Sequence, residues 1–213
     1  MTGWTTLLGG YDLRPLIRRE REDLAALLRT LTPTEWETES LCAGWRVRDV
    51  VAHLLHDSMP TATYLGDGVK ARGSLDRLNA AQIRRARSWS TEELLSRVEA
   101  SANTGLGAKL MPRLSLADLV IHHQDIRRPL GRVREIPEDR LLAVLHNPDP
   151  FAGAPQRMRG LKLVASDVDW QHGEGPEVRG PGEAIALSLA GRAAALTDLH
   201  GDGLETLRTR VHR

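Results

Sequence analysis

An acid and an imidazole stand four residues apart in the segment 115–131, SLADLVIHHQDIRRPLG. This spacing predicts that Asp118 and His122 lie one above the other on the same face of a helix. Ser115 has the spacing of a capping box and predicts the helix start, and Pro129 predicts its end. A carboxylate and a histidine placed in this way can hold a metal ion, although the same pair also occurs as a hydrogen-bonded pair on helix surfaces.

A third donor lies on another predicted helix, which spans residues 46–64. At about 100° per residue, its apolar residues form one stripe, with His53 at the edge and His56 directed further toward solvent. Asp118 and His122 lie at the corresponding edge of the apolar stripe of their own helix. If the two helices pack through these stripes, His53, Asp118 and His122 meet at the edge of the core. Two histidines and a carboxylate with one open position form a ligand set of catalytic zinc sites.

Neighbouring residues offer further ligands or supporting hydrogen bonds. Asp125 lies about one turn beyond His122, where it could compete as a ligand or orient the imidazole. His56 and Asp49 could do the same for His53. The sequence leaves open which of them would touch a metal ion and which would support a ligand.

Other reactive side chains have two interpretations each. Cys42 could be a nucleophile if a histidine lies beside it, or a small packing residue near the turn at Gly44. His123 falls within the apolar stripe of its helix, which favours packing in the core over a place in the site. A group of arginines after it could bind a carboxylate or a phosphate, or could form a solvated helix end: Arg127, Arg128, Arg132 and Arg134.

Composition excludes several classes of protein. The chain has 213 residues and a net charge of +1, which disfavours a dedicated nucleic-acid surface. Its single cysteine rules out an internal disulfide and a cysteine-rich zinc module. Because the sequence has neither an apolar run of membrane-spanning length nor a secretion signal at its start, we expect a soluble cytoplasmic protein.

Helical periodicity dominates the first part of the chain. Besides the two helices above, helices are predicted at residues 12–31 and 91–110, and residues 75–89 are either one helix or a loop with a helical turn. After about residue 132 the pattern changes to short mixed elements. Helices are predicted from residue 138, at 182–196 and at 203–211, strands at 160–167 and 177–180, and a turn at 172–176. We therefore predict a mainly α protein with a helical domain over residues 1–135 and a small α/β domain over 136–213.

Three ordered blocks of the sequence carry a family resemblance. LCAGWRVRDVVAHLL resembles a signature of the mycothiol-dependent maleylpyruvate isomerase-like proteins, which belong to the DinB-like metal-binding helical bundle superfamily. DLVIHHQDIRRPLG resembles the second signature of that family, and GLKLVASDVDWQHGEGPEVRGPGEAIALSLAGR resembles the C-terminal domain commonly attached to it. The resemblance covers about residues 10–200.

The resemblance implies a DinB-like four-helix bundle followed by a small α/β C-terminal domain. It also implies a divalent ion, usually zinc (Zn2+), held by a histidine of the second helix and an acid-xxx-His pair of the fourth, which here are His53, Asp118 and His122. Mycothiol is the implied cofactor or co-substrate. Arg192 is the best match to an arginine that contributes to the site from the C-terminal domain, and Arg127 is a second candidate for binding the cofactor.

The sequence departs from the family pattern at two positions near the expected site. Asp118 stands where a longer glutamate is frequent, so the carboxylate has to reach the metal from closer in. His123 stands where glycine is frequent, which could alter the shape of the pocket.

The leading hypothesis is an enzyme in which a metal-activated thiolate attacks a small electrophilic substrate, in thiol transfer or in maleylpyruvate-type cis–trans isomerisation. An arginine would hold the carboxylate of the substrate. The alternatives are a zinc-dependent hydrolase with a metal-bound water and a non-catalytic protein that binds a metal or a small ligand. The expected partners are the substrate and mycothiol, with no nucleic acid and no membrane, and the chain is expected to be a monomer or a homodimer.

Overall fold

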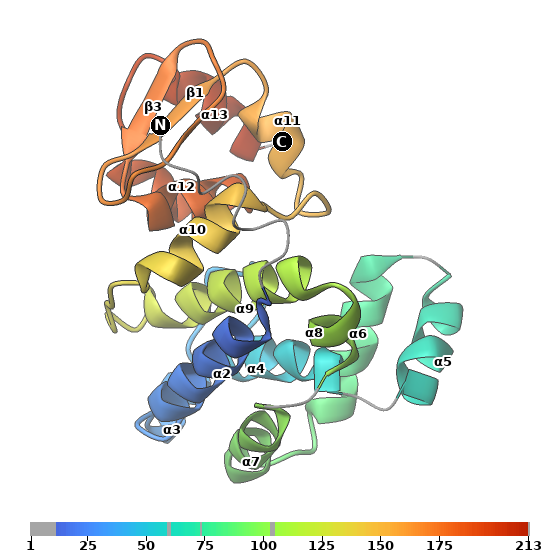
Figure 1. Cartoon of the computed structure of the whole chain (residues 1–213). Helices are drawn as coiled ribbons and strands as arrows, with labels where there is room; N and C mark the ends of the chain where they lie inside the picture. The colour runs from blue at the N-terminus through green and yellow to red at the C-terminus, as the bar shows by residue number, and fades with distance from the viewer. Residues whose placement is uncertain (1–11, 59–60, 73, 103–104, 213) are drawn as a thin grey trace. The chain divides into compact units, whose positions relative to one another are not determined.

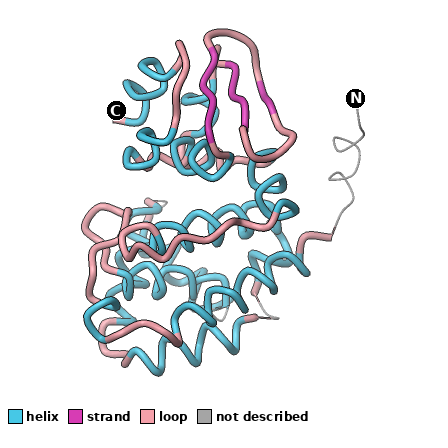
Figure 2. Tube along the Cα trace, turned by 90° about the vertical axis from the view of Figure 1, so that its left-hand side faces the viewer, coloured by secondary structure: helices cyan, strands magenta, loops and turns pink. Residues whose placement is uncertain are grey.

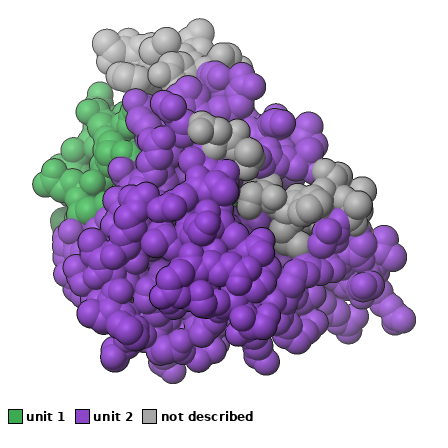
Figure 3. All heavy atoms as spheres, turned by 90° about the horizontal axis from the view of Figure 1, so that it is seen from below, with its two compact units in different colours: residues 1–11, 116–121, 134–213 green, residues 12–115, 122–133 purple. Residues whose placement is uncertain are grey.

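The computed structural model describes residues 12–58, 61–72, 74–102 and 105–212. The chain divides into two compact units. Unit 1 comprises residues 1–11, 116–121 and 134–213, and unit 2 comprises residues 12–115 and 122–133 (Figure 3). The division into domains 1–135 and 136–213 stays a prediction.

Unit 2 consists of helices joined by short connections (Figure 1). Within it, α2 packs against α7, and α4 packs against both α6 and α7. Its elements are α2 (Arg14–Leu28), α3 (Pro33–Trp36), α4 (Val47–Leu54), η1 (Leu55–Ser58), α5 (Thr61–Ala71), α6 (Leu75–Ala86), α7 (Thr91–Ser101), α8 (Leu106–Leu110) and the two ends of α9 (Pro112–Arg127).

The first helix, α2, has the apolar face that its sequence predicts. Leu16, Ile17, Leu24 and Leu28 recur at helical spacing and are at most 2% exposed. Pro15 lies in the first turn, where its missing N–H and fixed φ suit a helix start. The predicted helix over residues 12–31 is therefore confirmed with slightly closer ends.

The predicted helix over residues 46–64 is wrong in its length. α4 ends at Leu54, the chain continues as η1, and the separate helix α5 begins at Thr61. The sequence has a proline at position 60, and a proline lacks a backbone N–H and disfavours a helical residue before it, so one uninterrupted helix over 46–64 is disfavoured. The short α4 still contains His53, so the break does not remove the predicted donor from its helix.

The predicted helix over residues 91–110 is also two helices. α7 ends at Ser101 and α8 begins at Leu106. Gly105 has a φ of +131°, a conformation that no helix contains and that residues with a side chain rarely adopt. Of the two alternatives for residues 75–89, the structure has one helix, α6, whose first turn is capped by the Ser74 hydroxyl.

Helix α9 begins earlier than its sequence pattern predicts. It starts at Pro112, and Ser115 lies inside the first turn, where its backbone N–H donates to the carbonyl of Met111 at 3.0 Å. The predicted capping box at Ser115 is therefore wrong, since a proline in the first helical position marks the start instead. The predicted end is confirmed, with α9 ending at Arg127 and Gly131 in a left-handed turn at φ +63°.

Unit 1 combines short helices with a three-stranded sheet, which Figure 2 shows in magenta. The strand order is β2-β1-β3, with β1 antiparallel to β2 and parallel to β3. Helix α12 packs against β1 and α10. The elements are α10 (Glu138–His146), α11 (Ala154–Met158), β1 (Lys162–Ala165), β2 (Gln171–His172), β3 (Glu177–Gly180), α12 (Gly182–Leu189), η2 (Ala193–Asp198) and α13 (Leu204–Val211).

Two predictions for unit 1 are corrected. The predicted turn over residues 172–176 begins inside β2, where Leu163 of β1 pairs with His172. The predicted helix over residues 182–196 ends at Leu189 because Gly191, with φ +89°, turns the chain before η2 begins. The predicted strand over 177–180 is present with the same bounds as β3, whereas the strand over 160–167 and the last helix are present with shorter bounds.

The pair formed by Asp67 and Arg85 is expected to make unit 2 sensitive to acid. Asp67 is 5% exposed and accepts two hydrogen bonds from the Arg85 guanidinium at 2.7 and 3.0 Å. These bonds lower the pKa of the Asp67 carboxyl, so the pair stabilises the fold above the ordinary carboxyl pKa, and the contribution disappears as pH falls through the lowered pKa. Asp67→Asn is expected to lower the free energy of unfolding by about 2 kcal/mol at neutral pH.

Urea unfolding at pH 7 and at about pH 3 measures this effect. The difference between wild type and Asp67→Asn should shrink at the lower pH. Glu93→Gln is the control, because Glu93 pairs with Arg97 on the exposed surface and should contribute at most about 0.5 kcal/mol. An Asp67→Asn difference that stayed constant with pH would contradict the assignment.

Among the residues that the structure describes, no helix has both the length and the hydropathy needed to cross a membrane.

Candidate metal centre

His53 is placed by the last turn of α4. The apolar stripe of this helix is fully buried at Val47, Val50 and Val51, and it turns His53 to the edge of the core at 7% exposure. Arg46 precedes the helix, and its backbone N–H donates to the Asp49 carboxylate at 3.0 Å. Asp49 therefore caps the start of α4. Its carboxylate accepts this backbone hydrogen bond, whereas the sequence had suggested that it supports His53.

His122 is oriented by Asp125, which lies on the same helix. The imidazole Nδ1 of His122 lies 2.8 Å from Oδ2 of Asp125, whose side chain is fully buried. Because a carboxylate only accepts, Nδ1 carries the proton in this bond and Nε2 is the nitrogen with the lone pair. A carboxylate behind the imidazole is the arrangement that commonly fixes metal-binding histidines in proteins.

His53 and His122 lie beside each other, with ring centroids 4.8 Å apart and ring planes at 73°. Asp118 is placed by α9 itself, one turn before His122, and is half-buried. Each of the three residues offers a ligand atom, and these atoms lie within 4.8 Å of one another. The sequence pattern and the helix packing thus bring together the three predicted ligands.

Cys42 is the residue near this cluster whose position the sequence does not predict. Its Sγ donates to Oδ2 of Asp125 at 3.0 Å and lies 3.5 Å from Nδ1 of His122. The neighbouring backbone N–H of Leu41 donates to the carbonyl of Asp125 at 3.1 Å. The loop before α4 is therefore bound to α9 at Asp125 through a side chain and through the backbone.

This attachment places Trp45 against the two histidines. The Trp45 ring centroid lies 5.2 Å from that of His53 and 6.2 Å from that of His122. The loop is held in shape by Gly44 at φ +75° and by hydrogen bonds from the Ser40 backbone and hydroxyl to the carbonyl of Trp45. A half-buried indole beside both rings limits their rotation and covers them from water.

A second group of donors shares His122 with the first one. Cys42, His122 and Asp125 also lie close enough to hold an ion. In this group Asp125 already accepts from both other members, so metal binding there would break two hydrogen bonds. The group formed by His53, Asp118 and His122 keeps these bonds intact and matches the nitrogen and oxygen donors that zinc accepts. The residues present therefore fit a divalent ion in the first group.

His56 lies beside His53 and outside both donor groups. Its Nδ1 lies 2.7 Å from the carbonyl of His53, and the two ring centroids are 5.0 Å apart. His56 therefore contacts the last turn of α4 and the ring of His53.

His123 is packed in the core, as its place in the apolar stripe indicates. It is fully buried, its Nδ1 lies 2.7 Å from Oε1 of the equally buried Glu20, and its Nε2 accepts from Nε of Arg127 at 2.9 Å. Arg127 also donates to the carbonyl of Arg132 at 3.1 Å. This chain of hydrogen bonds through Glu20, His123 and Arg127 links α2 to α9. Arg127, which the sequence suggested for binding a cofactor, therefore forms hydrogen bonds within the fold.

Arg192 lies in unit 1 at the start of η2, half-buried, and donates to the carbonyl of Ala190 at 2.6 Å. Nearby, the guanidinium of Arg157 is held between Gly153 and Gly191 and donates to the carbonyl of Leu189 at 2.9 Å. Burial and the neighbouring charge of Arg192 lower the pKa of Arg157. The role of Arg192 in binding a cofactor stays a prediction.

Replacing Asp125 by asparagine is expected to weaken metal binding by about 10- to 100-fold without removing it. The amide cannot provide the negative charge that strengthens His122 as a ligand, and the bonds from His122 and Cys42 to this side chain become weaker. Competition with a chromogenic zinc chelator measures the affinity. Asp49→Asn is the matched control, since its carboxylate caps α4, and an equal loss in both variants would contradict the role assigned to Asp125.

The structure is mainly α with one small sheet, and it brings two histidines and one carboxylate together in one group. Residues 17–108 match the family model of the mycothiol maleylpyruvate isomerase N-terminal domain. The match includes His53 and ends before Asp118 and His122. The family match is therefore to the N-terminal part of the chain, which contains the first of the sequence blocks that resemble this family.

Two solved structures share the fold over nearly the whole chain. Crystal structures of the mycothiol-dependent maleylpyruvate isomerase and of a histidine-to-alanine mutant of it superpose with TM-scores of 0.61 and 0.62. The sequence identities are 17% and 16%, and each alignment covers 95% of this chain and 96% of the other. No curated protein matches the chain in sequence. The predicted fold class, a mainly α DinB-like bundle followed by a small α/β domain, is confirmed.

Proposed function

We propose that this chain is a metal-dependent enzyme that uses the low-molecular-weight thiol mycothiol as cofactor or co-substrate. The reaction class is cis–trans isomerisation of a small electrophile of the maleylpyruvate type, or transfer of the thiol to such an electrophile. The family match over residues 17–108 and the shared fold support the dependence on mycothiol. The donor cluster of His53, Asp118 and His122 carries the proposal that a metal is involved.

A divalent ion, most simply Zn2+, supplies one kind of chemistry when it is bound, namely the stabilisation of a thiolate near neutral pH. The residues of the chain do the rest. His53, Asp118 and His122 would hold the ion, and the bond to Asp125 keeps the proton on Nδ1 of His122 so that Nε2 has the lone pair for it.

Cys42 and Trp45 complete the surroundings of the donors. The Cys42 thiol donates to Asp125, so it is engaged in orienting a ligand. This agrees with a mechanism in which the nucleophilic sulfur comes from the added thiol. Trp45 covers the rings of His53 and His122 and lowers the access of water to them, which strengthens electrostatic interactions in the site.

Activity assays with zinc-loaded protein test the proposal. Maleylpyruvate tests isomerisation, and a chromogenic aromatic halide tests thiol transfer, each with and without mycothiol. We expect consumption of at least one substrate that requires both zinc and mycothiol and that is lost in His122→Ala. His172→Ala, which changes an exposed histidine of unit 1, should keep the activity.

The control reactions separate this proposal from its rivals. Zinc-dependent turnover of an ester or amide substrate without thiol would favour a hydrolase and contradict a thiol-dependent enzyme. Tight zinc binding with no turnover of either electrophile in the presence of mycothiol would favour a binding protein instead.

A further inference from the structure

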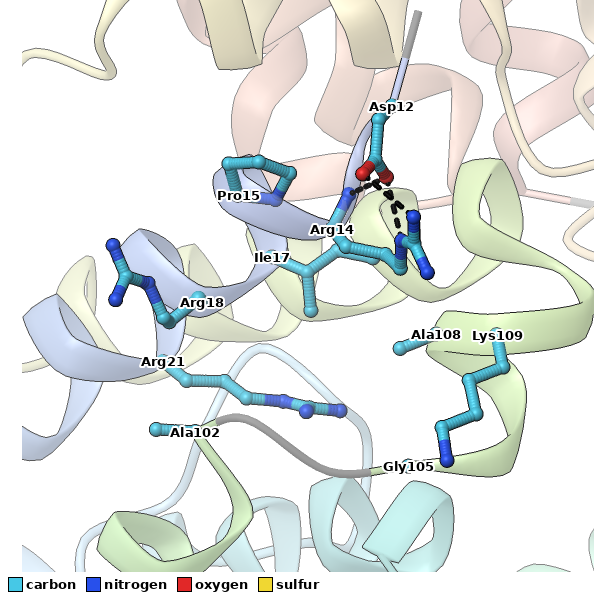
Figure 4. Close-up of a pocket in the computed structure, with 10 residues that line it drawn as sticks. All are labelled: Asp12, Arg14, Pro15, Ile17, Arg18, Arg21, Ala102, Gly105, Ala108 and Lys109. Carbon is cyan, nitrogen blue, oxygen red and sulfur yellow. Dashed lines mark hydrogen bonds and ion pairs between the residues drawn. The ribbon is translucent and has the colours of Figure 1, made fainter.

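A second candidate binding site lies in unit 2, in a cavity of about 350 Å³ beside the first half of α2 (Figure 4). α2 forms one side of the cavity through residues such as Ile17 and Arg21, and Ala102, Gly105 and α8 form the other. None of the described residues that line it belongs to the two donor groups of the metal centre. Its volume is at the small end of the range for pockets that bind small molecules.

Positive charge dominates the lining. Arg21 is 5% exposed and is fixed by a 2.7 Å hydrogen bond from its guanidinium to the carbonyl of Ser101 at the end of α7. Figure 4 shows its side chain extending along the cavity toward the side from which Lys109 approaches. Arg14 stands above them in the same view. Four cations therefore line one cavity, three of them from α2 and one from α8: Arg14, Arg18, Arg21 and Lys109.

Among the described residues that line the cavity, Asp12 is the one acidic residue, and it is bound to Arg14. Its carboxylate accepts two side-chain hydrogen bonds from the Arg14 guanidinium, at 2.7 and 2.8 Å. These bonds lower the pKa of Asp12, so the carboxylate is charged at neutral pH. A fork-to-fork pair of this kind is the contact that an arginine makes with the carboxylate or phosphate of a ligand.

We propose that this cavity binds a small organic dianion, with Arg21 at its floor, Lys109 and Arg14 at its mouth, and Asp12 in the place that an anionic group of the ligand takes. The shared chemistry is that of two negative charges on oxygen atoms, as in a dicarboxylate or a phosphate monoester. The apolar surface of Ile17 and Ala108 between the cations suits a short carbon skeleton.

Size and charge both limit the ligand. The excess of cations over Asp12 disfavours a neutral or cationic ligand, and the volume disfavours a nucleotide. Arg14 and Asp12 are at least half-exposed. Replacing the Asp12 carboxylate at Arg14 by an anionic group of the ligand therefore requires little free energy, and the binding should weaken as the salt concentration rises.

The test is a titration of the full chain with maleate and, separately, with inorganic phosphate, followed by amide chemical shifts at Ala102, Gly105 and Ala108. We expect saturable shifts at these residues with at least one of the two probes. The stronger probe identifies the ligand class as dicarboxylate or phosphate. Raising ionic strength from about 0.01 M to about 0.15 M should weaken the binding.

Exposed residues provide the variants, because replacing Arg21 would also break its bond to α7. Lys109→Gln should weaken the binding of the stronger probe by about threefold to tenfold, since it removes one partly exposed charge. Asp12→Asn should strengthen it by about twofold to fivefold, because it removes the competing carboxylate. Two effects of opposite sign distinguish a specific site from a general loss of folding.

Lys70→Gln in α5 and Arg19→Gln in α2 are the matched controls, since each removes a positive charge from an exposed residue that does not line the cavity. His53→Ala should bind the probe as wild type does, so the result is independent of the metal centre. Equal weakening by Lys109→Gln and Lys70→Gln, an unchanged affinity in Asp12→Asn, or the lack of shifts with both probes at about 10 mM would each overturn the proposal.

Discussion

The His53→Ala variant is expected to lose stoichiometric binding of a divalent metal, with an affinity for zinc more than about 100-fold below that of wild type. In the proposed centre His53 supplies one of two nitrogen donors among three ligands, and its ring lies 4.8 Å from that of His122. Removing a direct ligand should lower the affinity for the metal more than removing a residue that only orients a ligand. Elemental analysis of the purified protein and chelator competition measure the effect.

His56→Ala is the matched control for this prediction. His56 is a second histidine at the end of the same helical segment, with its ring 5.0 Å from that of His53, yet it is outside the donor group. We expect the variant to keep one metal per chain. Loss of metal in His56→Ala together with its retention in His53→Ala would place the centre elsewhere.

Replacing Glu20 by alanine is expected to destabilise unit 2 by about 3 kcal/mol. Glu20 and His123 are both fully buried, and Arg127 completes the chain of hydrogen bonds on the other side of the imidazole. Nε2 of His123 accepts from Arg127, so Nδ1 carries the proton and donates to Glu20. Alanine would leave that buried N–H without its acceptor and would leave Arg127 without the opposite charge across the ring.

Thermal and urea unfolding measure this loss, and the melting temperature should fall by about 6 to 12 °C. Glu20→Gln keeps an oxygen that can accept from Nδ1, so it should lose about half as much. Glu22→Ala, on the exposed side of the same helix, should change stability by at most about 0.5 kcal/mol. Equal effects of Glu20→Ala and Glu22→Ala would show that the buried chain contributes nothing to stability.

The meeting of His53, Asp118 and His122 could be predicted from the sequence because it depends on helical periodicity. The predicted placement of these residues around their helix axes, beside the two apolar stripes, agrees with the structure. The helix ends do not, since α4 ends ten residues before the predicted end and α9 begins three residues before the predicted start. Rotation about a helix axis depends on local spacing, whereas helix ends depend on prolines and glycines whose effects compete with periodicity.

The contacts of Cys42 and Glu20 could not be predicted in the same way. Cys42 lies in an irregular loop, and its bond to Asp125 joins residues 83 positions apart. Glu20 lies in a charged stretch of α2 that suggests a solvated face, yet it is buried against His123, 103 positions away. No periodic pattern encodes such long-range polar pairs, because each member alone resembles a surface residue.

The place of Asp125 lies between these cases. Its spacing of three residues from His122 predicts contact between the two side chains, but it fits a direct ligand as well as an orienting partner. In the structure its Oδ2 accepts from both His122 and Cys42. These bonds favour Asp125 as the residue that orients His122 over Asp125 as a direct metal ligand. The contact that distinguishes the two roles comes from the loop before α4, which the spacing of residues in α9 does not reveal.

The most direct test of the proposed metal- and thiol-dependent chemistry is titration of cobalt-substituted protein with mycothiol, followed by visible and near-ultraviolet absorption. The visible bands of the ion report the donors that hold it, and a sulfur-to-cobalt charge-transfer band reports a bound thiolate. We predict that this band grows to saturation at one thiol per metal and is lost in His122→Ala. A cobalt-loaded protein whose spectrum does not change at saturating mycothiol would contradict the account.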